Sequence, residues 1–314
     1  MYEIKPAFQE YLNKLLPDSE DMKAFLESCK KPTRVIIRCN TLKISPENLK
    51  KRLEDKGWKI SQVKNFPEAM VIESRLRPGE LGRSIEHQTG LYYVQELSSM
   101  MSALALDPKE HESVLDLCAS PGSKTTQISM MMKNTGFLLA NDVKIDRIRI
   151  LNSNLERCGC MNVIISRMDG VRLCESLASR KIFFDKILVD APCSGEGIIR
   201  SDPKVWTMYN PDMIRGIAAL QKKLIASALK CLKPHGILVY STCTFEPEED
   251  EKVIQFALEK LNVKIEEFYL PLKTRQGLKT WKDKEFFPDI NKCKRVFPQD
   301  NDTEGFFVAK LRKL

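Results

Sequence analysis

Residues 114–142 read VLDLCASPGSKTTQISMMMKNTGFLLAND, and this stretch decides the fold class of the chain around it. An apolar run (Val114–Cys118) leads into a Pro-Gly turn, a helical stretch (Lys124–Met132) and a second apolar run that ends in an acid (Phe137–Asp142). Short apolar runs that are bounded by turn residues and separated by one helix are typical of a βαβ unit in a parallel sheet.

The same alternation continues to about Thr244. Further strands are predicted over Val163–Arg167, Lys186–Asp190 and Gly236–Thr242, further helices over Ile145–Arg157 and Asp212–Leu232, and a last strand over Gly305–Leu311. The strand runs are nearly continuous in Ile, Leu and Val, as expected of strands that are buried on both faces. We therefore predict an α/β fold built on a doubly wound, mostly parallel sheet.

A smaller module precedes this sheet. Thr33–Leu42 (TRVIIRCNTL) has the composition of a strand, and Ser45 and Pro46 suit the N-cap and the first position of a following helix. We expect residues 1–84 to form a small α+β domain and residues 85–314 to form the main α/β domain.

The composition fits a globular protein with a polyanionic partner. Of the 314 residues, 43% are hydrophobic and 29% are charged, which is enough apolar content to bury a core and to exclude intrinsic disorder. Residues 1–84 hold 17 basic and 12 acidic residues, so they carry +5 of the net +8. This excess suits contact with a phosphate backbone without requiring it.

Membrane, secreted and metal-binding classes are disfavoured. No stretch reaches the roughly 18 apolar residues of a membrane helix, and charges interrupt the first residues, which excludes a secretory signal. The ten cysteines are scattered, and His87, His111 and His235 belong to no ligand motif. We expect a cytoplasmic protein with free thiols and no bound metal.

The turn at Pro121 and Gly122 is a candidate ligand site. It follows a strand and opens a helix, where parallel sheets bind their ligands, and its backbone N–H groups are able to face a bound group. The loop matches neither GxxxxGK[ST] nor GxGxxG, but Asp142 stands twenty residues past Gly122 at a strand end, where an acid accepts ribose hydroxyls. The alternative is an ordinary strand–turn–helix corner.

Acids recur at the ends of the predicted strands. Asp142, Asp169 and Asp190 each follow a different strand. The carboxyl ends of parallel strands meet at one edge of a sheet, and a buried carboxylate without a partner is costly. Three acids in register favour a site, although each one alone also suits a loop cap.

Two cysteines come directly after strands as well. Cys193 lies in DAPCSGEG (190–197) and Cys243 lies in YSTCT (240–244). A thiol near a cation or a helix N-terminus ionises and becomes a nucleophile, whereas a free cysteine elsewhere is usually a small buried hydrophobe. Two cysteines at neighbouring strand ends, one of them preceded by an acid, favour a catalytic pair.

Together these motifs resemble those of the Fmu/Sun-type RNA (cytosine-5) methyltransferases. DLCASPGSKTTQ (116–127), DAPCSGEG and YSTCTFEPEEDE (240–251) resemble motifs I, IV and VI, HQTGLYYVQELSSM (87–100) resembles the segment before motif I, and DTEGFFVAKL (302–311) resembles the closing strand. The likeness runs from about Thr33 to Leu311, and the early module resembles the family's small RNA-binding-like domain. One departure is Ser123, where the family usually has a second glycine. Serine is small, so we expect cofactor binding to survive.

The resemblance implies a Rossmann-like class I methyltransferase domain with S-adenosylmethionine as methyl donor. Carried over by position, Asp142 holds the ribose, Asp169 lies by the adenine, and Asp190 lies where cofactor and target base meet. Arg147 is a weaker candidate for a second ribose-side contact and is equally well explained as a solvated arginine. The loop residues assigned to the cofactor are Cys118, Ala119, Ser120, Pro121, Gly122, Ser123 and Lys124.

The same resemblance assigns the chemistry. Cytosine C5 is a weak nucleophile until a thiolate adds at C6, which is covalent catalysis. The residues alone do not say which cysteine attacks; the family pattern gives the attack to Cys243 and the later release of the RNA to Cys193. Asp190 is expected to hydrogen-bond the N3/N4 edge of the base, and Lys124 either approaches the flipped base or contacts solvent.

RNA is the implied partner. A target base must leave its stack to be methylated, and phosphate contacts from the early domain should weaken with salt. The segment KTWKDKEFF (279–287) either stacks on RNA or anchors a solvated loop. The chain's size suits the short archaeal tRNA-directed members, with rRNA as the alternative substrate, and we expect a monomer.

Two other classes fit less well. A nucleotide-binding oxidoreductase with reactive cysteines predicts a GxGxxG turn after the first strand, and that turn is absent. A non-catalytic RNA-binding protein has no need of two cysteines at strand ends beside an acid.

Overall fold

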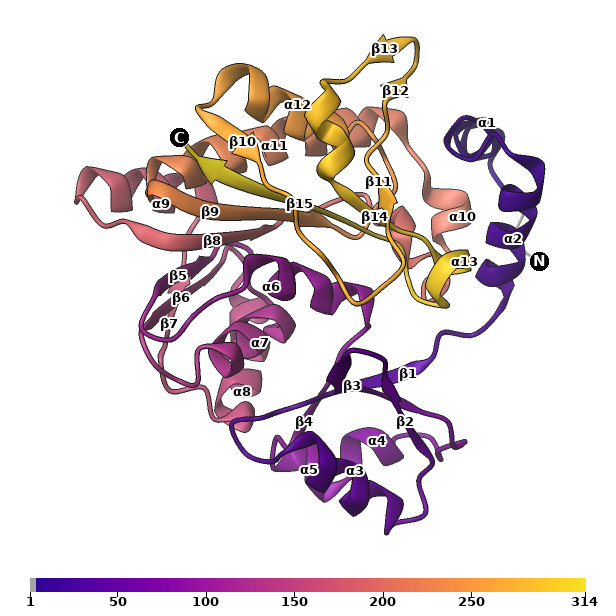
Figure 1. Cartoon of the computed structure of the whole chain (residues 1–314), viewed down its shortest axis with the longest axis vertical. Coiled ribbons are helices and arrows are strands. Elements are labelled where there is room, and N and C mark those ends of the chain that lie inside the picture. The colour runs from indigo at the N-terminus through magenta and orange to yellow at the C-terminus, as the bar shows by residue number, and fades with distance from the viewer. Residues whose placement is uncertain (1–3) are drawn as a thin grey trace.

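The computed structural model describes residues 4–314, which form a large upper part and a small lower lobe (Figure 1). Residues 1–3 of the expected first domain lie outside the described residues. One large sheet runs through the upper part. Its strands are β5 (Ser113–Asp116), β6 (Phe137–Asp142), β7 (Val163–Arg167), β8 (Phe184–Asp190), β9 (Leu232–Thr242), β10 (Val263–Ile265), β11 (Arg275–Gln276), β14 (Lys294–Val296) and β15 (Phe306–Lys313).

The large sheet is mostly parallel. Its order is β11-β14-β15-β9-β8-β5-β6-β7, with β10 also paired to β15. Strands β5 to β9 run parallel to one another, and β15 joins β9 in the antiparallel sense. Since β6 lies on one side of β5 and β8 on the other, a crevice opens beyond the carboxyl ends of β5 and β8, where such sheets bind ligands. The predicted doubly wound α/β fold is confirmed.

Helices cover both faces of this sheet (Figure 1). Alternate strand residues enter two separate cores, because successive side chains of a strand point to opposite faces. Val114 and Leu188 pack towards the first face, whereas Leu115 and Ile187 pack towards the second. The first face is covered by α6 (Met101–Leu106), α7 (Ser123–Met131) and α8 (Ile145–Cys158), and the second by α9 (Gly170–Ser179), α11 (Pro211–Lys230) and α12 (Glu251–Lys260).

The lower lobe is the predicted small α+β domain. Its antiparallel sheet has the order β2-β3-β1-β4, and the Ser45 hydroxyl caps its first helix by accepting from the Asn48 N–H at 3.3 Å. Because β4 comes from residues after Ser84, the sheet extends past the expected boundary. Its elements are β1 (Val35–Cys39), α3 (Pro46–Glu54), β2 (Ile60–Val63), β3 (Phe66–Ile72), α4 (Glu80–Arg83), α5 (Ile85–Gln88) and β4 (Tyr92–Val94).

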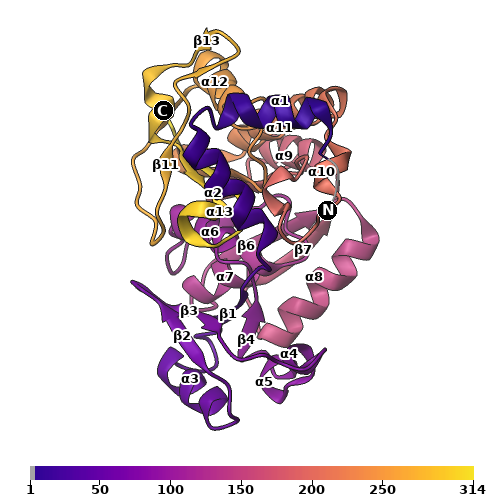
Figure 2. The same cartoon turned by 90° about the vertical axis from the view of Figure 1, so that its right-hand side faces the viewer.

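The first two helices do not join that lobe. Helices α1 (Pro6–Leu15) and α2 (Ser19–Lys30) lie against the upper part, beside α10 (Val205–Met208) and α13 (Pro298–Asn301) (Figure 2). The rings of Phe8 and Tyr11 each lie 5.1 Å from the ring of Tyr209, and Arg275 pairs with Asp21. The division into residues 1–84 and 85–314 therefore stays a prediction about independent folding units.

Two general properties complete the fold. No helix among residues 4–314 is both long and apolar enough to cross a lipid bilayer. All ten cysteines are free thiols.

Candidate active site

The loop between β5 and α7 is held against α8. Gly122 has a φ of +103°, and a Cβ there would lie 2.9 Å from Cδ1 of Leu151, so the position requires glycine. The Asn154 side chain donates to the Pro121 carbonyl at 2.9 Å, and the Ser120 hydroxyl donates to the Arg147 carbonyl at 2.6 Å. The predicted turn is therefore a fixed cradle whose backbone lies close to a neighbouring helix.

Arg38 of the lower lobe reaches the start of α7. Its guanidinium is fully buried and donates to the Ser123 carbonyl and to the Thr126 hydroxyl, each at 2.8 Å. Burial lowers the pKa of Arg38 to about 10. The small domain is thus joined to the candidate cofactor loop by a buried cation, a contact that sequence reasoning missed.

Asp142 and Arg147 meet beside this loop. Asp142 is 3% exposed and accepts from the Lys144 N–H at 3.1 Å. The Arg147 guanidinium lies 3.4 Å from the Asp142 carboxylate and donates to the Ser120 carbonyl. Arg147 therefore bridges the loop and the acid, although its side chain is still 45% exposed.

The other two predicted acids at this edge differ in their surroundings. Asp169 is exposed and caps α9 by accepting from the Arg172 N–H at 3.1 Å. Asp190 is a quarter exposed and lies at the end of β8. A further acid, Asp116, is fully buried at the end of β5 and accepts from the Thr125 hydroxyl at 2.7 Å. Burial raises the pKa of Asp116 to about 7.

Lys124 pairs with Asp190 inside a cavity. The ammonium lies 2.7 Å from the carboxylate, donates to the Ser99 hydroxyl at 2.9 Å and lies 5.3 Å above the Phe306 ring. The Ser241 hydroxyl donates to the other Asp190 oxygen at 2.7 Å. Because the lysine side chain is only 10% exposed, the alternative of a solvated Lys124 is wrong.

Cys193 and Cys243 are brought into contact. Their sulfur atoms lie 3.3 Å apart, and both residues are half-buried. The Gly197 N–H donates to the Cys243 carbonyl at 3.0 Å, and a Cβ on Gly197 would lie 2.7 Å from that carbonyl oxygen, so the close approach of the two loops requires glycine. The contact with Cys243, together with burial, raises the pKa of the Cys193 thiol. This contact does not fit the alternative in which each cysteine is a separate hydrophobic residue of the core.

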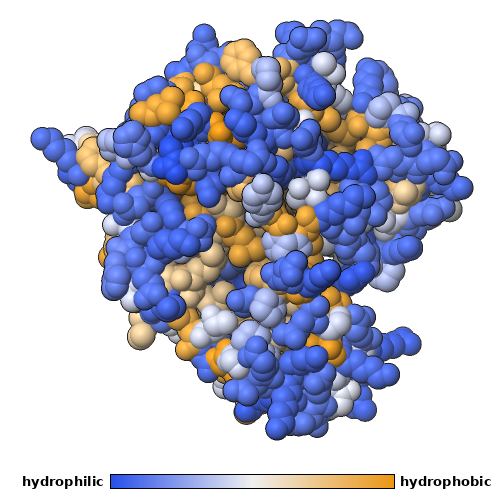
Figure 3. Space-filling view, in the orientation of Figure 1, coloured by the Kyte–Doolittle hydropathy of each residue, from blue (hydrophilic) through white to orange (hydrophobic). Residues whose placement is uncertain are grey.

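A cavity of about 520 Å³ joins these groups to the lower lobe. Its lining includes Lys124, Asp190 and Cys243 from the main domain and Val35 and Val94 from the small sheet. On the space-filling surface, apolar side chains lie along the junction between the two parts (Figure 3). A mostly apolar cavity with a few converging polar groups suits an aromatic ligand such as a nucleobase.

The segment KTWKDKEFF is a hairpin of β12 (Thr280–Trp281) and β13 (Lys284–Glu285). Trp281 is buried, with its ring 5.9 Å from that of Tyr11. Stacking of Trp281 on RNA is therefore excluded, whereas Phe287 is 44% exposed. Of the two sequence-based explanations, the hydrophobic anchor holds for the tryptophan.

Sequence reasoning missed four of the site's residues: Arg38, Asp116, Ser241 and Phe306. Asp116 and Ser241 stand inside the quoted motifs beside strand ends, so the sequence carried a usable signal for both. Phe306 stands in the closing motif, but nothing in its pattern places it under Lys124. Nothing in the sequence around Arg38 distinguishes it from other arginines on strands, so its contact with α7 could not be predicted.

Comparisons with known proteins cover nearly the whole chain. Residues 103–312 match the family described as 16S rRNA methyltransferase RsmB/F, and residues 4–97 match the family described as the N-terminal domain of 16S rRNA methyltransferase RsmF. The Pyrococcus abyssi tRNA (cytosine(49)-C(5))-methyltransferase is 41% identical over 302 residues, which take in 95% of this chain and 93% of that protein.

Two further proteins show the extent of the likeness. Ribosomal RNA small subunit methyltransferase F of Vibrio parahaemolyticus is 41% identical over 318 residues, or 99% of this chain and 63% of that protein. The chain thus spans less than two thirds of the Vibrio protein. A crystal structure of a methyltransferase homolog protein from Pyrococcus horikoshii superposes with a TM-score of 0.87 at 37% identity, covering 99% of this chain and 95% of the other.

Proposed function

Because this chain belongs to the RsmB/F family of S-adenosylmethionine-dependent RNA methyltransferases, we propose that it transfers a methyl group from that cofactor to C5 of a cytosine in tRNA. The Fmu/Sun resemblance read from the motifs is confirmed by the same matches. The observation that carries the proposed chemistry is the contact of two half-buried thiols beside a cavity with an Asp–Lys pair.

The residues around the Pro-Gly loop fit the cofactor. Gly122 keeps the turn close to α8, Asp142 is a buried acid in reach of the loop, and the exposed apolar Val143 follows it. In our proposal Asp142 accepts the ribose hydroxyls, Asp169 lies by the adenine, and residues 118–124 line the cofactor. When bound, S-adenosylmethionine supplies an electrophilic methyl group.

The cysteines perform covalent catalysis in this proposal. The Cys243 thiolate adds to C6 of the flipped cytosine, and the electron pair of the C5=C6 bond makes C5 the nucleophile that takes the methyl group. Once the Cys243 sulfur is bonded to C6, it no longer raises the pKa of Cys193, and the Cys193 thiolate then removes the C5 proton. The C5–H electrons restore the double bond as the C6–S bond breaks, which returns the thiolate to Cys243.

Asp190 and Lys124 stabilise the charge that develops on the ring. Asp190 lines the cavity next to Cys243, where its carboxylate is able to accept from N4 and to share a proton with N3. Lys124 fixes that carboxylate by an ion pair at 2.7 Å. The pair is worth more in a cavity than in water, because the surrounding dielectric is lower.

The choice of tRNA is supported by the Pyrococcus abyssi relative. That protein is named for a tRNA cytosine and is 41% identical to this chain over 302 residues. The basic lower lobe, which borders the cavity, supplies phosphate contacts. A monomeric state and a cytoplasmic location belong to the same proposal, and the free thiols agree with a reducing compartment.

Bisulfite sequencing tests the proposal. Unmodified tRNA and 16S rRNA transcripts are incubated with the protein and S-adenosylmethionine, and cytosines that resist conversion are mapped. We expect protected cytosines in tRNA alone. Protection in rRNA alone would overturn the tRNA assignment, and protection in neither RNA would overturn cytosine-5 methylation.

A further inference from the structure

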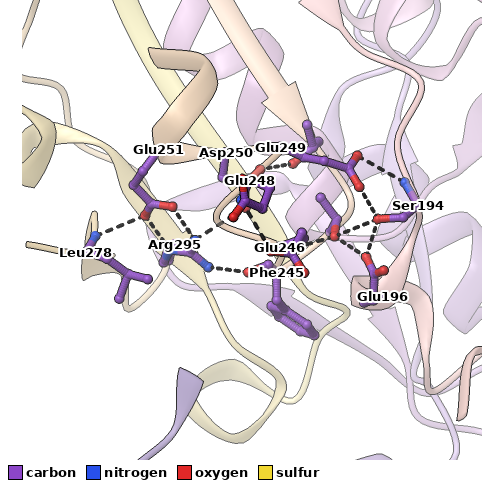
Figure 4. A network of polar contacts seen from close by, with 12 residues as sticks. Ser194, Glu196, Phe245, Glu246, Glu248, Glu249, Asp250, Glu251, Leu278 and Arg295 are labelled. Carbon is purple, nitrogen blue, oxygen red and sulfur yellow. Dashed lines mark hydrogen bonds and ion pairs between the residues drawn. The ribbon is translucent and has the colours of Figure 1, made fainter. Parts of the chain in front are cut away.

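A group of buried acids contacts the residues that follow the two cysteines, Ser194 and Thr244; Figure 4 shows Glu196 and Glu249 beside Ser194. We call Glu196 and Glu249 the carboxyl clamp; Glu196 opens a short helix, and Glu249 lies in the segment after Cys243. Both residues are at most 3% exposed. Burying carboxyl groups is costly unless hydrogen bonds satisfy them, so the partners of these two acids are informative.

Glu249 ties down the chain on both sides of Cys193. Its carboxylate accepts from the Ser194 N–H at 3.1 Å and is also contacted by the Ser194 hydroxyl. The Gln221 side chain donates to the same carboxylate at 2.8 Å and to the Pro192 carbonyl at 2.9 Å. One acid therefore holds both neighbours of the thiol.

Glu196 joins the two cysteine loops. The Ser194 hydroxyl lies 2.5 Å from its carboxylate, and the Thr244 hydroxyl contacts the same oxygen. Ser194 and Thr244 each follow one of the two cysteines. The Tyr240 hydroxyl donates to the main-chain carbonyl of Glu249 at 2.6 Å and so fixes the clamp to β9.

The charge state of Glu249 fits this role. Burial raises its pKa to about 7, so above neutral pH the group is an ionised acceptor that matches the donors facing it. The nearby cation Arg295 is engaged elsewhere, with Asp250 and Glu251. The clamp therefore depends on hydrogen bonds from the cysteine loops rather than on an ion pair with Arg295.

We propose that Glu249 is a positioning residue for the release step, holding the Cys193 loop so that its thiolate meets the C5 proton of the methylated adduct. The inference rests on the proposed methyl transfer. It concerns the step after transfer: a displaced Cys193 leaves the C5 proton in place, so the bond between C6 and the Cys243 sulfur persists. Attack by Cys243 is expected to be largely spared.

The test compares covalent adduct with methyl transfer. Glu249→Gln keeps the size of the side chain but leaves one acceptor oxygen instead of two. In the wild type the Ser194 N–H and the Gln221 amide donate to one carboxylate oxygen, and the Ser194 hydroxyl contacts the other. We expect release to slow about tenfold, the rate equivalent of one lost hydrogen bond to a charged group, so a protein–RNA species accumulates on denaturing gels. The rate of methyl incorporation in the first turnover should stay within about threefold of wild type, a smaller change than the loss of one such hydrogen bond would cause.

Glu248→Gln is the matched control. Glu248 is the adjacent acid but pairs with Lys252 at 2.7 Å and Lys282 at 3.3 Å instead of the cysteine loops. Its variant should show the wild-type level of adduct. Gln221→Met gives a second route if Glu249→Gln fails to fold, because it cuts the tie to Pro192 and should also raise the adduct level.

The outcomes separate the inference from the function beneath it. A folded Glu249→Gln protein with wild-type adduct levels would overturn the positioning role. A fall in methyl transfer without any rise in adduct would overturn it as well, because that result indicates a general structural role. If Cys193→Ala yields neither adduct nor methylated RNA, the proposed function itself fails, whatever Glu249 does.

Discussion

Asp142→Ala should weaken cofactor binding more than any other single change at the ribose end of the site. Asp142 is 3% exposed and stands beside the Pro-Gly loop, within 3.4 Å of Arg147. In the proposed complex its carboxylate accepts from ribose hydroxyls. Hydrogen bonds to a charged group contribute about 1.5–3 kcal/mol, so we expect Kd to rise by about 10- to 150-fold.

Calorimetric titration with S-adenosylmethionine measures this loss directly. Asp146→Ala is the matched control, because Asp146 lies on the first turn of the adjacent helix with 86% of its side chain exposed. The control should bind the cofactor as wild type does. Asp142→Asn should fall between the two, since an amide retains one acceptor oxygen but not the charge.

An unchanged Kd in a folded Asp142→Ala protein would refute the reasoning. The same holds for equal losses in the Asp142 and Asp146 variants, which would point to a general electrostatic effect. Melting curves of both variants show whether the loss of the partner of Arg147 has disturbed the fold.

Three other predictions address the base, the RNA and pH. Lys124→Met removes the partner of Asp190 and should slow methyl incorporation about 100-fold, the usual cost of losing one electrostatic group at a reacting centre; a rate within threefold of wild type would contradict the role. Replacing the exposed Arg75 and Arg77 of the lower lobe by alanine should reduce the slope of log affinity against log salt by about two in filter binding, and an unchanged slope would place the phosphate contacts elsewhere. Burial raises the pKa of Glu246 from 4.5 to about 7. Between these two pH values the folded protein keeps a proton that the unfolded chain has lost, so the free energy of unfolding falls as pH rises from 4.5 to about 7. Glu246→Gln should remove this fall and stabilise the protein at pH 8 by up to about 3 kcal/mol in urea unfolding, whereas an unaltered pH dependence would refute the assignment.

The central sheet was predictable because its strands are continuous apolar runs. Strands β6 and β7 have the predicted ends, whereas β5 ends at Asp116 instead of Cys118. The chain after Asp116 leaves the sheet to form the cradle, so Cys118 lies in the loop and not in a strand. Helix α9 was not predicted from the sequence, although Asp169 is a residue type that caps helices and is the N-cap of α9.

Contacts between distant segments were not predictable from local patterns. Helices α1 and α2 have ordinary amphipathic sequences, and nothing in them says that Phe8 packs on Tyr209 of the main domain. Because of this packing, deletion of residues 1–84 would uncover part of the main core, so point substitutions test RNA binding more cleanly. Trp281 likewise gave no local sign that Tyr11 covers it.

The candidate site was predictable where parallel strands bring their ends together. That rule predicts Asp142, Asp169, Asp190, Cys193 and Cys243 at one edge of the sheet. The rule gives no information on residues that contact the cysteine loops from elsewhere in the chain. Glu249 is one of them, and it reaches Ser194 only because the loop after β9 folds back over the strand ends. The spacing of acids in EPEEDE (246–251) resembles a solvated charge run, but four of the five acids are buried.

Denaturing gels of single and double cysteine variants test the covalent mechanism most directly. With tRNA and S-adenosylmethionine, Cys193→Ala should accumulate a slow-migrating protein–RNA species, because transfer proceeds while release fails. Cys243→Ala and the double variant should give no such species, and Cys243→Ala should still bind the cofactor. Adduct in Cys243→Ala instead would exchange the two roles, and full activity without adduct in both single variants would contradict covalent catalysis.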